Sequence, residues 1–271
     1  MTDGDLVPRL PDHAVETITA FLRSHCLYHG NEGAVLGLSG GVDSALVARL
    51  ARDALGAEKI LGISMPDTAY PRDLARETDQ YAHALGIEYR TVGIEKIESA
   101  YRTTLPDVKD RVTVGNTKAR IRMTVLYALA RDRRRVVLGT GNKSELLLGY
   151  FTKHGDGGVD LLPIGDLYKT EVWELSAQLN LPRAVRERAP SAGLWEGQTD
   201  EEELGLAYRE LDRILYGLER GLAEEEIAAR TRQPIERVRQ YAQRVVAYRH
   251  KRRSAPIPKI GARTVGVDWD P

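Results

Sequence analysis

The most constraining feature of this chain is the stretch GLSGGVDSAL, which runs from Gly37 to Leu46. Apolar residues just before it (34–36) are typical of a buried strand, and those after it (45–51) are typical of a helix. A turn of small residues between a strand and a helix leaves backbone N–H groups at the helix N-terminus available to an anion. The stretch therefore predicts a loop that binds phosphate.

The residues of this loop suit that role. Gly40 and Gly41 permit a close approach and any positive φ that the turn needs, while Ser39 and Ser44 supply hydroxyl donors. Asp43 places a carboxylate where Mg²⁺ bound to phosphate needs an oxygen ligand. The loop is not of the Walker A type, because no Gly-Lys-Ser/Thr follows it.

Composition narrows the class of protein. The 271 residues allow one large domain or two small ones, and we expect a single domain over 1–271 with a helical part at about 200–253. Lys plus Arg and Asp plus Glu both number 39, which gives no global argument for nucleic acid or a membrane surface. Cys26 is the single cysteine, and the N-terminus lacks a signal-peptide pattern, so we expect a cytoplasmic protein.

Strands and helices are expected to alternate along the first half of the chain. Strand patterns at 59–64, 87–92 and 135–139 are separated by helical segments of ten or more residues. This alternation predicts an α/β fold with a doubly wound, mainly parallel sheet and helices on both faces. Ligands of such sheets bind beyond the carboxyl ends of the strands, where the Gly37–Ser44 loop is expected to lie.

A long helix is predicted over Gly115 to Arg133, with apolar residues facing the core. Lys118, Arg120 and Arg122 lie in its first half, and charges in such a helix usually face solvent. We assign Lys118 and Arg122 to a solvated face.

A second turn of small polar residues, Thr140 to Glu145, follows the strand at 135–139. Glu145 stands at the start of a helix, where its carboxylate either complements the helix dipole or serves as a second ligand of the metal held by Asp43. The glycines at 155–158 predict a mobile loop, and Lys169 stands near the start of a further helix.

The last third is predicted to be helical. Glu201 to Leu218, Ala223 to Arg230 and Pro234 to Arg249 each have a helical pattern, after an irregular segment at 190–200. The last two helices also allow a helix-turn-helix interpretation, with arginines offered to DNA phosphates, but packing is the commoner role of such pairs. His25 and His29 are four residues apart, a metal-ligand spacing for which no third ligand is evident.

The loop SGGVDS resembles the signature of the N-type ATP pyrophosphatases, which split ATP between its α and β phosphates. Taken with further segments of the chain, the whole set resembles the ammonia-dependent form of the NAD synthetase family. Those segments are GNTKARIRM, GTGNKSE, GYFTKHGDGGVDLLPIGDLYKT, PSAGLWEGQTDEEELG and RHKRR. The resemblance implies an adenine nucleotide alpha hydrolase-like fold.

The same resemblance implies a ligase reaction in two half-steps. The nicotinate carboxylate of deamido-NAD attacks the α-phosphorus of ATP, which gives an acyl-adenylate and pyrophosphate, and ammonia then displaces AMP to leave NAD. Because adenylation already supplies the leaving group, the protein has mainly to position two anions and neutralise the departing pyrophosphate.

The resemblance also implies roles for individual residues. Asp43, Lys169 and Asp156 are the expected catalytic residues, and Asp43 and Glu145 the expected Mg²⁺ ligands. The ATP-binding set is Gly37, Leu38, Ser39, Gly40, Gly41, Val42, Asp43, Ser44, Thr140, Lys169 and Ser191. The deamido-NAD set is Arg120, Lys153, Asp160, His250 and Lys251.

A homodimer is implied as well, with the dinucleotide bound across its interface, so that His250 and Lys251 could act on the partner's site. The chain has no candidate nucleophilic cysteine for a glutaminase, so free ammonia or a separate glutaminase is the expected nitrogen source; no nucleic acid or membrane partner is expected. Two other ATP pyrophosphatase activities stay open as alternatives, namely a GMP synthetase-type amidation and tRNA thiolation.

Overall fold

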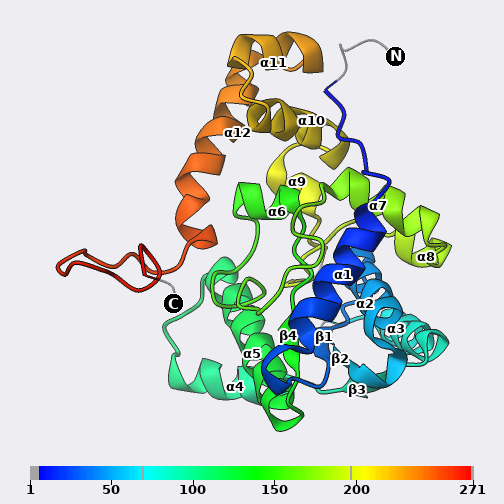
Figure 1. Ribbon diagram of the computed structural model, residues 1–271. Helices are drawn as coiled ribbons and strands as arrows, with labels where there is room; N and C mark the ends of the chain where they lie inside the picture. The colour runs from blue at the N-terminus through cyan, green and yellow to red at the C-terminus, as the bar shows by residue number, and fades with distance from the viewer. Residues whose placement is uncertain (1–5, 69, 196, 270–271) are drawn as a thin grey trace.

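The computed structural model of the chain describes residues 6–68, 70–195 and 197–269. Its centre is a four-stranded sheet made of β1 (Ala34–Gly37), β2 (Ile60–Ser64), β3 (Glu88–Thr91) and β4 (Val136–Leu138). The strands lie in the order β3-β2-β1-β4 and every pairing is parallel (Figure 1). The predicted parallel sheet is confirmed.

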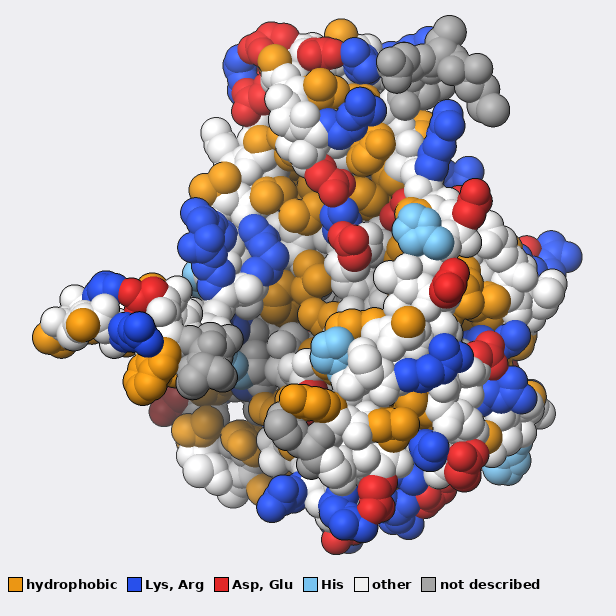
Figure 2. Space-filling view, in the orientation of Figure 1, with side chains coloured by type: hydrophobic (Ala, Val, Ile, Leu, Met, Phe, Trp, Pro, Cys, Tyr) orange, Lys and Arg blue, Asp and Glu red, His pale blue; other side chains and the backbone are white. Residues whose placement is uncertain are grey.

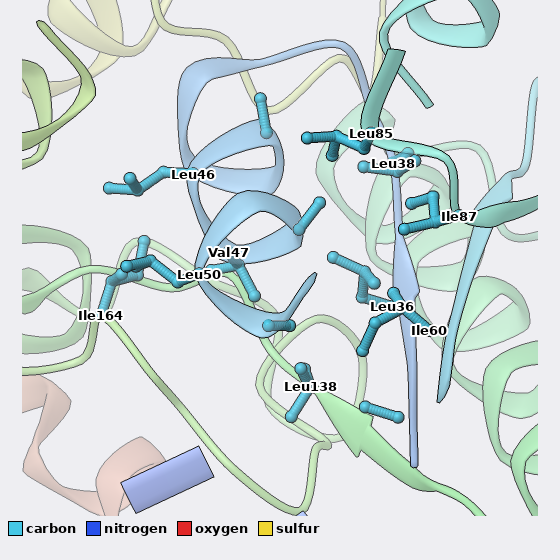
Figure 3. Packing of buried hydrophobic residues seen from close by; sticks show 14 of the residues in the cluster. Leu36, Leu38, Leu46, Val47, Leu50, Ile60, Leu85, Ile87, Leu138 and Ile164 are labelled. Carbon is cyan, nitrogen blue, oxygen red and sulfur yellow. The ribbon is translucent and has the colours of Figure 1, made fainter. Parts of the chain in front are cut away.

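Helices cover both faces of the sheet. On one face lie α2 (Val42–Leu55) and α3 (Arg72–Leu85), with α1 (Ala14–Cys26) packed against α2. Figure 3 shows the leucine and isoleucine side chains that fill the space between α2 and the sheet. On the other face, α5 (Arg111–Asp132) buries Ile121 against the strands. Because each face has its own apolar core, the doubly wound arrangement is confirmed.

The sheet order creates a switch point between β1 and β4. From β1 the chain winds outward through β2 and β3, then returns to place β4 on the other side of β1. Loops that leave the carboxyl ends of two such neighbouring strands diverge to opposite faces and open a crevice between them. The loop after β1 and the turn that begins at Thr140 therefore lie on either side of this crevice.

The remaining elements of the first 200 residues are short. They are α6 (Lys143–Leu148), α7 (Lys169–Gln178), α4 (Glu95–Thr104), α8 (Arg183–Arg186) and two 3₁₀ turns, η1 (Tyr28–Gly30) and η2 (Ala57–Lys59). The sequence did not indicate α4 or α8. Glu98 is the one residue of α4 that is buried, so this helix lacks the apolar periodicity by which helices are recognised.

The C-terminal part contains α9 (Asp200–Leu204), α10 (Tyr208–Glu219), α11 (Glu224–Thr231), α12 (Ile235–Ala247) and the 3₁₀ turn η3 (Tyr248–Arg252). These helices form a second apolar core, which includes Leu148 of α6 (Figure 1, top). The prediction of one helix over Glu201 to Leu218 is wrong. Gly205 adopts a φ of +79° and ends α9, so the chain turns before α10 begins.

The arginines of α11 and α12 are engaged within the protein. Arg239 pairs with Glu224 and Glu225, and Arg244 donates to the Leu148 carbonyl at 3.1 Å. Because Ile227 and Val238 bury these helices in the second core, the packing role is the better interpretation of this helix pair.

Lys118 and Arg122 do not face solvent, so the assignment of both to a solvated face is wrong. Lys118 is buried, and its Nζ donates to Asp67 Oδ2 at 2.6 Å and to the Leu194 carbonyl at 3.1 Å. Arg122 Nε donates to the Met65 carbonyl at 3.1 Å. Their partners come from loops 51 to 76 residues away in the sequence, which the local pattern of α5 does not reveal.

His25 contacts its own helix, since its ring stands 4.3 Å from that of Phe21 and its Nδ1 lies 2.8 Å from Ser24 Oγ. The side chain of His29 lies outside the described part of the structure. Among the described residues, no helix has the length and apolar character needed to cross a bilayer.

Candidate active site

A cavity of about 650 Å³ opens at the carboxyl ends of β1 and β4. Its walls come from the loop after β1, the loop after β2, α5, the segment 149–159, the loop 189–198 and η3. Figure 2 shows Lys and Arg side chains gathered over the C-terminal half of α12, next to this region. The cavity is large enough for a nucleotide and has polar groups at one end, as small-molecule sites usually do.

The loop after β1 is held in a fixed shape. Gly40 has a φ of +80°, and a Cβ atom there would lie 2.3 Å from Leu74 Cδ1, so any other residue would be strained and would displace the Leu74 side chain. Ser44 Oγ donates to the Gly41 carbonyl at 3.0 Å and accepts from Ser39 N at 3.3 Å. These bonds fix the turn so that the first turn of α2 points its N–H groups toward the cavity.

Two carboxylates and one ammonium group meet at the inner end of the cavity. Lys169 Nζ donates to Asp43 Oδ2 at 2.5 Å and lies 3.6 Å from Glu145 Oε1. Asn142 Nδ2 donates to the other oxygen of Asp43 at 3.0 Å. We call Asp43, Glu145 and Lys169 the inner triad.

The inner triad has an excess of negative charge in a desolvated place. Burial, assisted by Asp43, raises the pKa of the Glu145 carboxyl to about 8, while Lys169 acts in the opposite direction. Burial alone would lower the pKa of the Lys169 ammonium, but Asp43 and Glu145 raise it above its usual range. Lys169 therefore stays charged, and the two carboxylates can accept further positive charge.

Asp212 supports the inner triad from behind. This fully buried carboxylate accepts hydrogen bonds from Ser144 Oγ at 2.5 Å, from Thr170 N at 2.9 Å and from Thr170 Oγ1 at 2.8 Å. Ser144 Oγ in turn accepts from Lys169 N at 3.0 Å. The network fixes the starts of α6 and α7, which carry Glu145 and Lys169. An acidic residue within the apolar stripe of α10 was the sequence signal for Asp212.

Most of the predicted ATP and metal residues line the cavity. They are Gly37, Leu38, Ser39, Gly41, Val42, Asp43, Ser44, Thr140, Glu145, Lys169 and Ser191, and the predicted residues Asp156 and Lys251 line it too. Gly40 lies beside it. The structure thus brings together segments that are more than 100 residues apart in the chain.

Arg120, Lys153 and His250 are not among the residues that line this cavity. Arg120 Nη2 donates to the Lys153 carbonyl at 3.3 Å, and Lys153 Nζ donates to the His250 carbonyl at 2.8 Å. We call these three residues the outer rim. Asp160 lies elsewhere, since its carboxylate accepts from Tyr127 and from Val137 N and so ties its loop to the sheet.

Lys251 faces the cavity of its own chain. Its Nζ donates to the Gly149 carbonyl at 2.6 Å and to the Phe151 carbonyl at 2.8 Å. Gly149 has a φ of +61°, and a Cβ atom there would lie 2.3 Å from Tyr248 Cβ, which explains why η3 can approach this segment so closely.

The glycine-rich segment forms a compact turn. Gly155 N and Gly157 N donate to the Thr152 carbonyl, and Thr152 N donates to the exposed Asp156 carboxylate at 2.9 Å. This turn places Asp156 at the opening of the cavity.

Several cavity residues were missed by sequence reasoning. Arg188 pairs with Glu77 and donates to the Gly40 carbonyl, and Tyr70 donates to the Ser39 carbonyl at 3.0 Å. Asp200 and Tyr150 line the inner part of the cavity as well. Only the three-dimensional arrangement joins these residues to the loop after β1.

The fold and the inner triad together define an α/β protein that binds nucleotide phosphates. The chain belongs to the NAD synthase family, whose model matches residues 14–255. It is 48% identical over 246 residues to the NH(3)-dependent NAD(+) synthetase of Methanococcoides burtonii, covering 90% of this chain and 94% of that relative. The enzyme of the same name from Pyrococcus horikoshii is 44% identical over 256 residues, covering 94% of this chain and 97% of the relative.

Solved structures agree with this assignment. The NMN synthetase of Francisella tularensis superposes with a TM-score of 0.80 at 34% identity, covering 93% of this chain and 100% of that one. The NH3-dependent NAD synthetase from Campylobacter jejuni, in complex with the nitrate ion, gives a TM-score of 0.77 at 31% identity, with coverages of 91% and 97%.

Proposed function

We propose that this protein is an NH3-dependent NAD synthetase. It amidates deamido-NAD with ammonia at the expense of ATP, and it releases AMP and pyrophosphate through an acyl-adenylate. The observation that carries this function is the inner triad at the N-terminus of α2, in a chain of this family. The N-terminus of α2 and Lys169 face the same end of the cavity, so together they can bind the ATP phosphates.

The chemistry divides between the two ends of the cavity. At the inner end, Lys169 and the N–H groups of α2 neutralise charge on the phosphates as the bond between the α- and β-phosphates breaks. The nicotinate carboxylate has to reach the α-phosphorus from the direction of Asp156 and Lys251. Because no covalent nucleophile of the protein is needed, positioning of the two anions is the main contribution.

The residues present fit a magnesium ion. Asp43 and Glu145 supply oxygen ligands, and within the inner triad these two carboxylates face the single ammonium of Lys169. Within the described residues no three His, Cys, Asp or Glu side chains group as a metal site, so phosphates and water would complete the coordination. When bound, the ion would neutralise the departing pyrophosphate.

The deamido-NAD contacts belong to the same proposal. Lys251 offers a charge inside the cavity, and the outer rim offers Arg120 and Lys153 to the anionic dinucleotide. We also propose a homodimer and action in the cytoplasm. Because Lys251 lines its own chain's cavity, we propose that it serves its own active site.

A second candidate activity comes from the fold neighbour named NMN synthetase. Nicotinate mononucleotide has the same reactive carboxylate as deamido-NAD and lacks the AMP half. The inner triad would serve both substrates equally well, so substrate choice depends on the outer part of the cavity.

The deciding assay combines the protein with ATP, Mg²⁺, ammonium and either deamido-NAD or nicotinate mononucleotide. We expect NAD, AMP and pyrophosphate in equal amounts, with deamido-NAD preferred. A preference for the mononucleotide would establish the second activity. Release of ADP, or turnover with xanthosine monophosphate, would refute the proposed function.

A further inference from the structure

Arg188 is a cationic side chain beside the loop after β1 to which the proposed roles give no task. It lies just after α8 and lines the cavity, 148 residues along the chain from Gly40. One Nη atom donates to the Gly40 carbonyl, and the other donates to the Glu77 carboxylate of α3. Arg188 therefore connects the loop after β1 to a helix on one face of the sheet.

A second side chain holds the preceding carbonyl of the same loop. The Tyr70 hydroxyl donates to the Ser39 carbonyl at 3.0 Å. Two successive carbonyls are thus bonded by side chains from outside the loop. In a trans peptide unit the C=O and N–H groups point in opposite directions. The N–H groups of Gly40 and Gly41 therefore point away from Tyr70 and from Arg188, respectively.

The peptide unit between Gly40 and Gly41 needs such a restraint. Glycine adopts positive and negative φ about equally well, so a peptide unit between two glycines can reverse its direction with little steric cost. Gly41 lines the cavity, and its N–H bonds only to Ser39 Oγ, at 3.3 Å. Reversal would place the Gly40 carbonyl oxygen where this N–H now lies. A carbonyl oxygen there would repel the phosphates that N–H groups attract.

We propose that Arg188 is a positioning residue for ATP, because it fixes the direction of the Gly40–Gly41 peptide unit. This inference rests on the proposed function. Glu77 accepts from the second Nη and so keeps the first directed at the Gly40 carbonyl. A planar guanidinium bonds two acceptors at a fixed angle, which a lysine ammonium does not reproduce.

Arg188→Met removes both bonds and keeps much of the side-chain volume. We expect kcat/KM for ATP in NAD synthesis to fall about tenfold to a hundredfold, the effect of losing one hydrogen bond from a charged donor. Arg183→Met is the matched control, since it removes the same charge from an 80% exposed side chain of α8. It should change kcat/KM for ATP less than about twofold.

An NMR measurement separates positioning from a general effect of charge. The chain has two Gly-Gly pairs, 40–41 and 157–158. Protein labelled with glycine that has a ¹³C carbonyl and a ¹⁵N amide gives one carbonyl–amide correlation from each pair. In Arg188→Met the 40–41 signal should move, because its carbonyl loses a charged donor, while the 157–158 signal should stay. Arg183→Met should leave both signals in place.

A kcat/KM for ATP that changes less than about twofold in Arg188→Met overturns the proposal. A fall in kcat/KM with the 40–41 signal unmoved also overturns it, because Arg188 would then act on the phosphates through its charge alone. Should Arg188→Met fail to fold, Arg188→Ala is judged by the same outcomes. Absence of NAD synthesis by the unchanged protein would instead refute the proposed function, and the 40–41 signal would still test the direction of the peptide unit.

Discussion

The inner triad and the outer rim are both made of charged side chains, but they are built in different ways. In the inner triad the Lys169 side chain is 2% exposed and the Asp43 side chain 18%, and each group bonds directly to an opposite charge. In the outer rim, Arg120 and His250 are exposed, and the two hydrogen bonds that join its members end on backbone carbonyls. The inner triad is therefore organised before any ligand binds, whereas the rim has to be ordered by the ligand.

The largest effect should come from Lys169→Met, which leaves Asp43 and Glu145 buried without their cation. We expect the free energy of unfolding without Mg²⁺ to fall by about 3 to 5 kcal/mol, and kcat to fall by about 10² to 10³. Urea unfolding and NAD synthesis measure the two effects. Lys169→Arg keeps the charge and should retain most of the stability. A methionine variant with more than a tenth of the original kcat would show that the inner triad is not the phosphate site.

Asp212→Asn tests whether the Asp212 hydrogen bonds that fix the starts of α6 and α7 contribute to catalysis. The substitution keeps the size but weakens bonds to Ser144 and to Thr170, each of which fixes the start of a helix. We expect about a tenfold loss of kcat, with little change in the KM for ATP, because hydrogen bonds to charged groups contribute about 1.5 to 3 kcal/mol. Asp166→Asn is the control, since that side chain is 97% exposed. A rise in KM without a fall in kcat would contradict the positioning role.

The fold was predictable from the sequence because its signals are local. Strands β1, β2 and β4 each have a short apolar run, whereas β3 is mostly polar and is bracketed by Ile87 and Val92. The long helices between strands have helical periodicity, so the order and type of these elements follow from neighbouring residues. Errors arose where local pattern and tertiary contact disagree. Lys118 has the charge of a surface residue, and only the approach of Asp67 from another loop buries it. Gly205 ends a helix that its flanking residues would otherwise continue.

The positions of Asp43 and Glu145 were also predictable from local sequence signals, whereas much of the remaining cavity wall was not. Asp43 and Glu145 each follow a strand in a recognisable turn, so the sheet brings them together. Arg188 and Asp200 follow no strand, and although Asp200 lies within the segment PSAGLWEGQTDEEELG, that segment gave it no role. Their positions depend on how the 189–198 loop folds back over the cavity, which involves contacts such as Arg188 with Glu77 across 111 residues.

Lys251 is intermediate between the inner triad and the outer rim. Its side chain is partly buried, as in the inner triad, but it bonds to backbone carbonyl oxygens, as in the outer rim. We expect Lys251→Ala to raise the KM for deamido-NAD about tenfold through loss of one charged contact, with little effect on the KM for ATP. Steady-state kinetics with each substrate varied in turn measures this. Arg253→Ala removes an exposed charge two residues away and serves as the control. An unchanged KM for deamido-NAD would remove Lys251 from the binding set.

The smallest effect should come from Lys153→Met in the outer rim. Its ammonium bonds to the His250 carbonyl and remains partly solvated, and exposed charge contacts contribute about 0.2 to 1 kcal/mol. We therefore expect the KM for deamido-NAD to rise no more than about fivefold at low salt, and the difference to shrink as salt screens the charge. Lys169→Met should lose kcat at every salt concentration, because a buried pair is screened much less. If Lys153→Met instead lost activity at all salt concentrations, the rim would have to close over the dinucleotide and exclude water, and the contrast with the inner triad would hold only for the ligand-free protein.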